Sequence, residues 1–267
     1  MLRRSDGRVF KPVVKPLLGK REISFYENLQ TSQDPVMLQL KNYVPRYYGT
    51  TELQIFGRRV TFLTLKDITD GMAEPCVMDI KIGRRTWDPL ATPEKKATEE
   101  LKYAESKRTY GFCITGFQVY CVSTGKLRQF GKHYGKTLDA NAVIIQMSFN
   151  VSLVTPERPP CRQLIVMLLS FLWKILLFFR MQRLFRFYSS SLLVAYDAKR
   201  LRHYLRLNNT NKQNWVRINM IDFTHVFPAE DQNALDLNYL EGIENLIKLN
   251  RKPEVVNRDN VCILSHK

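Results

Sequence analysis

Cysteine and histidine are scarce and scattered in this chain of 267 residues. The five cysteines include no Cys-x-x-Cys pair, and no two of the four histidines stand at the i, i+4 spacing of a helical metal site. An odd number of widely separated cysteines also favours no disulfide framework. These shortages argue against a His/Cys metal centre and predict a reducing compartment.

The N-terminus lacks the apolar segment of a secretory signal, because its basic residues are followed by no hydrophobic stretch. We therefore expect an intracellular protein. Acidic residues are also few, since 25 Asp and Glu oppose 41 Lys and Arg and leave a formal net charge of +16. A surplus of this size predicts an anionic partner, which can be nucleic acid, a membrane surface or a polyphosphorylated small molecule.

No acidic residue occurs between Glu157 and Asp197, and Leu164 to Phe179 is almost entirely apolar. A helix of this length spans about 24 Å, less than the roughly 30 Å hydrocarbon core of a bilayer. Lys174 within it would add an insertion cost of about 2.5 to 3.5 kcal/mol. We therefore predict a buried or half-buried helix of the C-terminal part, with membrane attachment as the alternative that the flanking arginines support.

The composition is otherwise that of a globular protein, since 45% of the residues are hydrophobic. A chain of this length forms one large domain or two lobes. A β-branched and aromatic strand is predicted at residues 59–65, and Asp70-Gly71 interrupts the pattern soon after it. We place the joint there, between an N-terminal lobe at residues 1–68 and a larger C-terminal lobe at residues 69–267.

The other predicted elements follow from hydrophobic spacing and turn residues. Helices are expected at 22–30, 36–40, 93–106 and 239–249, strands or extended segments at 8–14, 43–48, 112–121, 188–196 and 215–222, and turns at 132–136 and 207–214.

The stretch Pro75-Cys-Val-Met-Asp-Ile-Lys-Ile-Gly83 alternates between two kinds of side chain. Its apolar residues form one row, so Asp79 and Lys81 share the opposite face of the predicted strand. A carboxylate and an ammonium side by side at a cleft can hold a metal-bound nucleotide and neutralise a phosphoryl group in transfer. The alternative, which these nine residues alone favour, is an exposed ion pair on an edge strand.

Two further patterns involve charged residues at the ends of predicted elements. Asp222 follows an apolar row at the end of the strand 215–222. Lys11 lies on a predicted strand and Glu22 opens the next helix, which is the arrangement that kinases use to hold nucleotide phosphates. Each pattern alone is weak.

The predicted helix 93–106 carries Lys95 and Lys102 on one side, with Thr98 or Glu99 one turn between them. Such a face can bind phosphate groups, whereas the alternative is an ordinary solvated helix face.

Three separated pieces of the sequence together resemble the inositol polyphosphate kinases. They are Pro75-x-x-x-Asp79-x-Lys81-x-Gly83, Ser190-Ser191-Leu192-Leu193 and Ile221-Asp222-Phe223. Their order and separation match the family, and the resemblance extends from about residue 8 to residue 249. The longer strings at 78–89 and 221–228 look most like the multikinase branch, because inositol hexakisphosphate kinases usually follow the lysine motif differently.

The resemblance implies an α+β fold of two lobes, distantly similar to protein kinases, with an antiparallel sheet in the small N-terminal lobe. It also implies a kinase that moves the γ-phosphate of ATP to hydroxyls of inositol polyphosphates, such as inositol 1,4,5-trisphosphate. Phosphatidylinositol 4,5-bisphosphate is left open as a second substrate. ATP and Mg²⁺ are the implied cofactors.

The same resemblance implies residue roles at the nucleotide. Lys11 would hold ATP phosphates, Glu22 would orient Lys11, and the backbone of Lys66, Asp67 and Ile68 would meet adenine.

At the reacting groups, Asp222 would carry Mg²⁺, a hard cation that prefers oxygen ligands. Asp79 would lie beside the accepting hydroxyl, close to the nucleotide, and Lys81 would neutralise the transferring group.

A set of basic and polar residues matches positions that bind substrate phosphates in the family. It consists of Lys81, Lys95, Thr98, Lys102, Lys132 and His225, and composition adds Lys15, Lys20 and Arg21. Contacts between such cations and phosphate are charge-assisted, which would explain the large positive charge of the chain.

Two alternatives stay open at this point. One is a hexakisphosphate kinase that makes pyrophosphates, and the other is a non-catalytic module that binds phosphoinositides or nucleic acid. A binding module gains nothing from Asp79 and Asp222 in a positive site, whereas a metal-dependent kinase needs at least one of them. We expect a monomer of the nucleus and cytoplasm that requires no nucleic acid.

Overall fold

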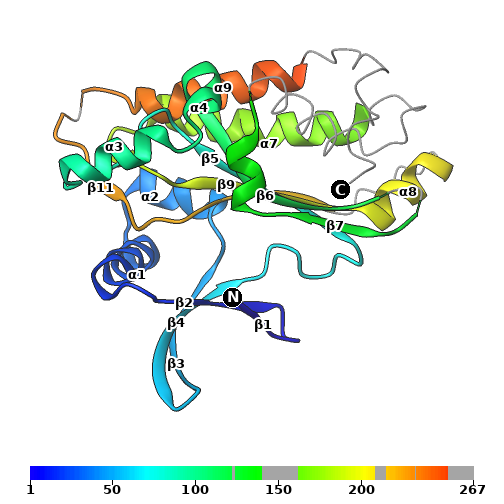
Figure 1. Ribbon diagram of the computed structural model, residues 1–267, viewed down its shortest axis with the longest axis horizontal. Helices are drawn as coiled ribbons and strands as arrows, with labels where there is room; N and C mark the ends of the chain where they lie inside the picture. The colour runs from blue at the N-terminus through cyan, green and yellow to red at the C-terminus, as the bar shows by residue number, and fades with distance from the viewer. Residues whose placement is uncertain (122–123, 140–161, 208–214, 232, 252–267) are drawn as a thin grey trace.

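The computed structural model describes residues 1–121, 124–139, 162–207, 215–231 and 233–251 (Figure 1). Within this part, antiparallel strands form three sheets, and helices pack against them. Figure 1 shows a small N-terminal sheet on one side and a larger C-terminal body on the other. The fold is therefore α+β with two lobes, as the family resemblance implies.

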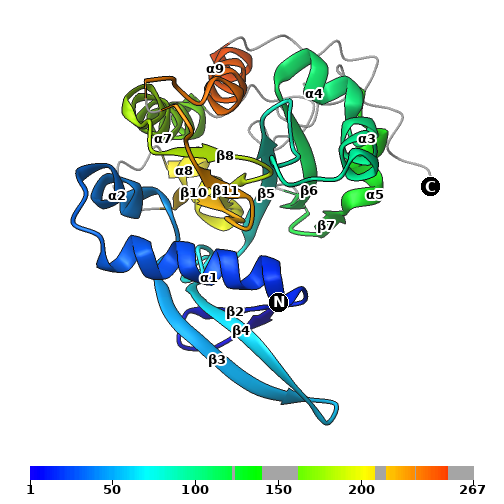
Figure 2. The ribbon, with the colours of Figure 1, turned by 90° about the vertical axis from the view of Figure 1, so that its left-hand side faces the viewer.

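The N-terminal sheet has the strand order β1-β2-β4-β3. Its strands are β1 (Leu2–Arg3), β2 (Arg8–Pro12), β3 (Tyr47–Ile55) and β4 (Arg58–Lys66). The strand predicted at 59–65 is confirmed as β4. Strand β3 continues well past the extended segment predicted at 43–48. The prediction missed this part because the strand has polar residues at alternate positions and therefore contains no apolar run. The β3–β4 hairpin projects away from the body (Figures 1 and 2).

Helix α1 (Pro16–Thr31) begins at Pro16 rather than at Glu22. Proline is favoured at the first helical position, where its missing N–H costs no hydrogen bond. Gly19 argues against a helix in the sequence, but it lies so close to Val13 that a Cβ atom there would overlap the valine side chain. The prediction therefore missed the first turns of the helix.

Aromatic contacts join α1 to both lobes. Phe25 stacks on Phe223 with 4.5 Å between ring centroids, and Tyr26 stacks on Tyr47 at 5.2 Å. Figure 2 shows α1 running between the N-terminal sheet and the C-terminal body. The lobes thus meet through a packed helix, and the domain boundary near residue 68 stays a prediction.

The C-terminal sheet has the order β10-β9-β5-β6-β7. Its strands are β5 (Pro75–Ile82), β6 (Phe112–Tyr120), β7 (Leu127–Phe130), β9 (Ser191–Asp197) and β10 (Val216–Ile221), and β8 (Phe185–Phe187) pairs with β11 (Val226–Pro228) apart from it. Strand β5 lies at the centre, paired with β6 and β9, and its buried residues alternate as predicted. The alternative of an exposed pair on an edge strand is therefore wrong.

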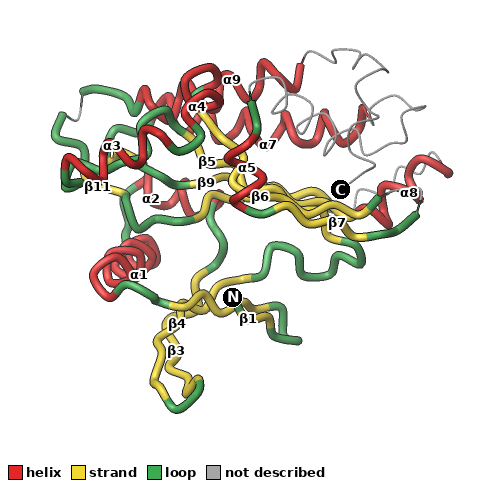
Figure 3. The backbone as a smooth tube through the Cα atoms, viewed as in Figure 1, coloured by secondary structure: helices red, strands yellow, loops and turns green. Residues whose placement is uncertain are grey.

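Helices α7 (Arg162–Met181) and α9 (Leu237–Arg251) lie on one side of this sheet, and the N-terminal sheet lies on the other (Figure 3). The other described helices are α2 (Pro35–Leu40), the 3-10 helix η1 (Lys41–Tyr43), α3 (Pro93–Leu101), α4 (Ala104–Tyr110), α5 (Lys132–Thr137) and α8 (Ala198–Leu207). The predicted turn at 132–136 is wrong, since α5 occupies it. The turn predicted at 207–214 falls almost wholly outside the described residues.

The predicted helix 93–106 is broken into α3 and α4. Tyr103 has a φ of 54°, in the left-handed region, and Lys102 before it is extended. A tyrosine seldom adopts this conformation, so nothing in the sequence announces the break. Lys102 consequently lies beyond the end of the helix that carries Lys95, and the shared helical face predicted for them is wrong.

Helix α7 packs into the C-terminal lobe against α9 and β10, which confirms the predicted location. Its 20 residues correspond to about 30 Å. The argument that it is too short to span a membrane is therefore wrong. Gln163–Met181 is long and apolar enough to cross a bilayer, and 39% of it is buried within the protein. Leu177 and Met181 are among its exposed apolar residues.

Candidate active site

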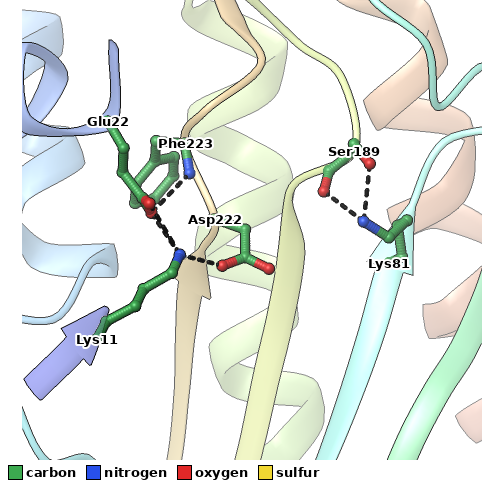
Figure 4. A network of polar contacts seen from close by, with 6 residues as sticks. All are labelled: Lys11, Glu22, Lys81, Ser189, Asp222 and Phe223. Carbon is green, nitrogen blue, oxygen red and sulfur yellow. Dashed lines mark hydrogen bonds and ion pairs between the residues drawn. The ribbon is translucent and has the colours of Figure 1, made fainter. Parts of the chain in front are cut away.

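Lys11, Glu22 and Asp222 meet between the two lobes (Figure 4). The Nζ atom of Lys11 lies 2.8 Å from each Glu22 oxygen and 2.5 Å from Oδ1 of Asp222. Burial alone would lower the pKa of Lys11, but the two carboxylates raise it above its ordinary value. The lysine is thus a fixed cation, as the kinase-like pattern predicted.

Each member of this network comes from a different element. Lys11 lies on β2, Glu22 lies in α1 and is almost fully buried, and Asp222 directly follows β10. The backbone N–H of Phe223 donates to Glu22 Oε1 at 3.2 Å, which ties the C-terminal lobe to α1. The network therefore depends on the packing of both lobes.

Left-handed backbone conformations border the site. Among the described residues, four that are not glycine have a positive φ, and three of them are Tyr103 (54°), Ser189 (59°) and Asp222 (63°). Such conformations cost free energy and gather at functional sites, where they aim a side chain. At Asp222 the conformation turns the carboxylate out of the strand toward the space between Lys11 and Lys81 (Figure 4).

Asp79 lies on β5, on the face opposite the row of buried apolar residues. Its Oδ1 atom is shielded from solvent and makes no hydrogen bond of regular geometry among the described residues, although the Ser191 and Thr115 hydroxyls lie close enough to lower its pKa. Burial and the nearby Asp222 carboxylate raise the pKa of Asp79. A pocket runs from Asp79 across Gly116 to Gly131, the residue before α5. The structure thus places a carboxylate of raised proton affinity in an open hollow.

Lys81 shares one face of β5 with Asp79, as the alternation predicts, but no salt bridge joins them in the part of the chain that the structure describes. Its Nζ atom donates to the carbonyl of Ser189 at 2.7 Å and to the Ser189 hydroxyl at 2.8 Å. Ser189 was not predicted as part of the site, although it directly precedes the Ser190-Ser191 motif. Ser189 thus fixes the position of the Lys81 ammonium through two hydrogen bonds.

The two carboxylates differ in their electrostatic surroundings. Burial would raise the pKa of Asp222, but the charges of Lys11, Lys81 and Lys132 lower it below its ordinary value. Asp222 therefore stays ionised, while Asp79 binds a proton more readily. Lys132, predicted as a substrate ligand, begins α5 and lies close enough to act on Asp222.

Asp222 is suited to a divalent cation. The described residues contain no group of three or more His, Cys, Asp or Glu side chains that could hold a metal ion. Mg²⁺ does not need such a group, because it is usually bound by one or two carboxylates together with phosphate oxygens and water. An ionised carboxylate at the cleft fits this requirement.

In the segment predicted to meet adenine, residues 66–68, the side chains of Lys66 and Asp67 already make contacts within the protein. Lys66 pairs with Asp70 at 2.5 Å, and Oδ1 of Asp67 accepts from the backbone of Thr69 at 2.8 Å. A guanidinium nitrogen of Arg217 donates to the Ile68 carbonyl at 2.7 Å. The N–H groups of Lys66 and Asp67 also donate to main-chain carbonyls, so the segment is held in place from within the protein and its contact with adenine stays a prediction.

The predicted substrate residues of α3 have different surroundings. Lys95 is exposed, and its charge contributes to lowering the pKa of His225. The Thr98 hydroxyl donates to a carbonyl of its own helix at 2.8 Å, and Lys102 pairs with Glu99 at 2.7 Å. The structure thus brings Lys95 near His225, whereas Thr98 and Lys102 are occupied by local contacts.

His225 contacts a carboxylate that was not predicted. Its Nδ1 atom lies 2.5 Å from Oδ2 of Asp88, and a guanidinium nitrogen of Arg21 lies 3.9 Å from the same oxygen. Asp88 is only 2% exposed. The one signal for it in the sequence is its place in the string 78–89, which follows the lysine motif.

A family model described as inositol polyphosphate kinase matches residues 62–251, which is more than half of the chain. The chain belongs to the inositol polyphosphate kinase family. This confirms the resemblance stated from the three motifs.

Individual relatives agree with this assignment. Human inositol polyphosphate multikinase is 29% identical over 214 residues, which cover 78% of this chain and 50% of that protein. The multikinase beta of Arabidopsis thaliana is 27% identical over 257 residues, covering 91% and 84%. Human inositol hexakisphosphate kinase 3 is 31% identical over 219 residues, covering 72% and 51%. The chain spans about half the length of the mammalian multikinases that it matches.

Two solved structures share the fold. An inositol phosphate multikinase structure superposes with a TM-score of 0.68 at 24% identity, covering 86% of this chain and 98% of that one. The multikinase of S. cerevisiae in complex with ADP and Mn²⁺ gives 0.69 at 20% identity, covering 91% and 98%. The two-lobed fold is thus that of known multikinases.

Proposed function

We propose that the chain is an ATP- and magnesium-dependent kinase that phosphorylates hydroxyl groups of inositol polyphosphates. The observation that carries this proposal is the meeting of Lys11, Glu22 and Asp222 opposite Asp79, with the pKa values of the two aspartates shifted in opposite directions. A pair of carboxylates separated in this way suits one to bind a cation and the other to accept a proton.

In this proposal Lys11 binds phosphate oxygens of ATP and Glu22 holds its ammonium in position. Asp222 is the ligand of a divalent cation, which would neutralise the nucleotide phosphates and orient the γ-phosphate. The yeast multikinase that shares the fold was solved with ADP and Mn²⁺, which supports a nucleotide and a divalent metal here. Magnesium is the specific ion that we propose.

Asp79 accepts the proton of the attacking hydroxyl in the proposed reaction. A base is most effective when its pKa lies near the working pH, so a raised pKa suits an aspartate to this role. Lys81, held by Ser189, lies where it neutralises charge on the transferring phosphoryl group.

The acceptor that we propose is a soluble inositol phosphate, such as inositol 1,4,5-trisphosphate. Lys132 acts on Asp222 and Lys95 acts on His225, and Lys81 acts on both of these groups. Several cations around one cleft match a ligand that carries several phosphates. Use of a phosphoinositide lipid, a monomeric state, and a nuclear and cytoplasmic location stay predictions.

A second candidate is an inositol hexakisphosphate kinase, which the match at 31% identity to the human enzyme favours. The purified protein would be incubated with ATP, Mg²⁺ and a panel of inositol phosphates from the tris- to the hexakisphosphate. We expect phosphate transfer to ring hydroxyls of the tris- and tetrakisphosphates. Pyrophosphate products from the hexakisphosphate alone would favour the second candidate, and transfer to no inositol phosphate would contradict both.

A further inference from the structure

The chain contains a buried carboxylate, Asp88, to which the proposed reaction assigns no role. Asp88 lies in the loop after β5 and is 2% exposed. Its Oδ1 atom accepts from the backbone N–H of Leu90 at 2.9 Å, which leaves Oδ2 for other partners. A buried charge is costly unless it is paired and hydrogen-bonded, so Oδ2 needs polar partners as well.

Those partners are an imidazole and a guanidinium from distant parts of the chain. His225 Nδ1 lies 2.5 Å from Oδ2, and a guanidinium nitrogen of Arg21 lies 3.9 Å from it. Arg21 belongs to α1, whereas His225 lies between β10 and β11. The guanidinium of Arg21 also lies over the ring of Phe227 on β11, 5.2 Å from its centroid. One carboxylate therefore joins α1 to the segment that leads into β11.

The contact with Asp88 decides which ring nitrogen of His225 is protonated. An ionised carboxylate only accepts hydrogen bonds, so Nδ1 must carry a proton and Nε2 is the nitrogen left for a ligand. In the neutral ring Nε2 would be an acceptor and would repel phosphate oxygens. In the imidazolium both nitrogens donate, so His225 binds phosphate well only when it is charged.

Charged groups from four segments act on this ring. Asp88 favours the imidazolium, whereas Lys95 of α3 and Lys81 of β5 oppose it, and Arg21 of α1 shares the same carboxylate. Burial also opposes the charge, and on balance the pKa of His225 lies below its ordinary value. Asp88 is thus the group that counteracts the surrounding positive charge.

We propose that Asp88 is a positioning residue of the substrate site, which holds His225 and Arg21 so that both cations face one phosphate group of the acceptor. This inference rests on the proposed function, because the acceptor is taken to be a phosphorylated inositol. Asp88 itself does not touch the substrate. It keeps the proton of the neutral His225 ring on Nδ1, which leaves Nε2 for the ligand, and it joins α1 to the segment before β11.

The test is a comparison of Michaelis constants in the full-length chain. Asp88→Asn keeps the shape of the side chain but removes its charge, so the KM for the inositol phosphate should rise about tenfold, as expected for a lost charge-assisted contact. The kcat and the KM for ATP should change less than twofold. Glu241→Gln is the matched control, because it removes an exposed carboxylate that pairs with Arg84 away from the cleft, and both constants should stay unchanged.

A double-mutant cycle shows whether Asp88 acts through His225. Asp88→Asn should raise KM by a clearly smaller factor in the His225→Gln background than in the wild type, since only its effect through Arg21 is left. The pH profile should also respond: the KM for the inositol phosphate should rise with pH as the imidazolium is lost, and this rise should begin at a lower pH in Asp88→Asn.

Equal increases in both Michaelis constants, or additive effects in the cycle, would overturn the proposal while leaving the kinase activity established. A wild-type protein that phosphorylates no inositol phosphate would instead contradict the proposed function. Should Asp88→Asn not fold, ¹⁵N NMR of the wild-type His225 ring decides the matter. A neutral ring protonated at Nδ1 supports the proposal, and one protonated at Nε2 overturns it.

Discussion

Asp79 and Asp222 are two aspartates on one sheet with opposite chemistry. Both are partly buried, yet Asp222 lies 2.5 Å from Lys11, whereas Oδ1 of Asp79 makes no hydrogen bond of regular geometry among the described residues. The ammonium groups lower the pKa of Asp222, and burial with a like charge raises that of Asp79. Because Asp222 contacts Lys11 and Asp79 does not, Asp222 stays an anion, whereas Asp79 accepts a proton more readily.

The same difference has opposite consequences for stability. A carboxyl whose pKa is lowered by folding stabilises the protein above its unfolded pKa, and this contribution is lost as the pH falls through the folded value. That is the case for Asp222. A raised pKa has the reverse sign, so the ionisation of Asp79 reduces stability as the pH rises through the interval between its unfolded and folded values.

The largest expected effect is that of Asp222→Asn. Loss of the proposed metal ligand should lower kcat by about 10⁴-fold or more, because the charge of the nucleotide phosphates is no longer neutralised. The free energy of unfolding at pH 8 should fall by about 1 kcal/mol, a modest loss because the Asp222 side chain is 38% exposed and solvent screens its pair with Lys11. Steady-state kinetics and thermal unfolding check both. Turnover close to that of the wild type would contradict the metal assignment.

Asp79→Asn should be nearly as damaging to turnover but opposite in stability. Loss of a general base lowers kcat by about 10² to 10⁴-fold. Asp79→Asn removes a buried negative charge whose pKa is raised by burial and by Asp222, more than the Ser191 and Thr115 hydroxyls lower it. The folded protein should therefore stay as stable as the wild type or gain about 1 kcal/mol at pH 8. Chemical denaturation of the two variants side by side measures this difference. A destabilised Asp79→Asn protein would show that the carboxylate has a structural partner instead.

The pH dependence of kcat sharpens the comparison without a substitution. Protonation of Asp79 removes the base, so kcat should fall as the pH is lowered through its raised pKa, while Asp222 is still ionised. The fall should therefore begin at a higher pH than for an ordinary aspartate. A rate that stays constant down to the ordinary range of aspartate would exclude Asp79 as the base.

The smallest effects are expected on the acceptor side of the cleft. Lys95→Ala should raise the KM for the inositol phosphate about tenfold and leave that for ATP unchanged, because it removes binding to one substrate only. Lys102→Ala should raise it only about threefold, since Lys102 already pairs with Glu99. Initial-rate kinetics with each substrate varied in turn give both constants. Equal losses for ATP and acceptor would argue against a substrate role for either lysine.

The sequence was most informative where a role depends on local spacing. Alternation along β5 places Asp79 and Lys81 on one face. The position of Asp222 directly after an apolar strand marked it as a candidate site residue. Alternation says nothing about neighbouring strands, so the central position of β5 was not predictable from it. A lysine on a predicted strand followed by a glutamate at the start of a helix indicated the pairing of Lys11 with Glu22, and the family resemblance added the roles of the two residues.

Contacts between residues that are distant in the chain could not be predicted from the sequence. Lys81 is held by Ser189, 108 positions away, and His225 by Asp88, 137 positions away. Neither spacing follows a helical or strand period, so no pattern announces it. The break at Tyr103 was missed for a different reason, because a left-handed tyrosine has no sequence signature.

The most direct test of the central claim is nucleotide binding without turnover. Isothermal titration calorimetry would measure the Kd of a non-hydrolysable ATP analogue with Mg²⁺ for the wild type, Asp79→Asn and Asp222→Asn. We predict that Asp79→Asn binds within about threefold of the wild type, whereas Asp222→Asn binds at least about fiftyfold more weakly. Equal losses in the two variants, or a larger loss in Asp79→Asn, would contradict the division of roles between the two aspartates.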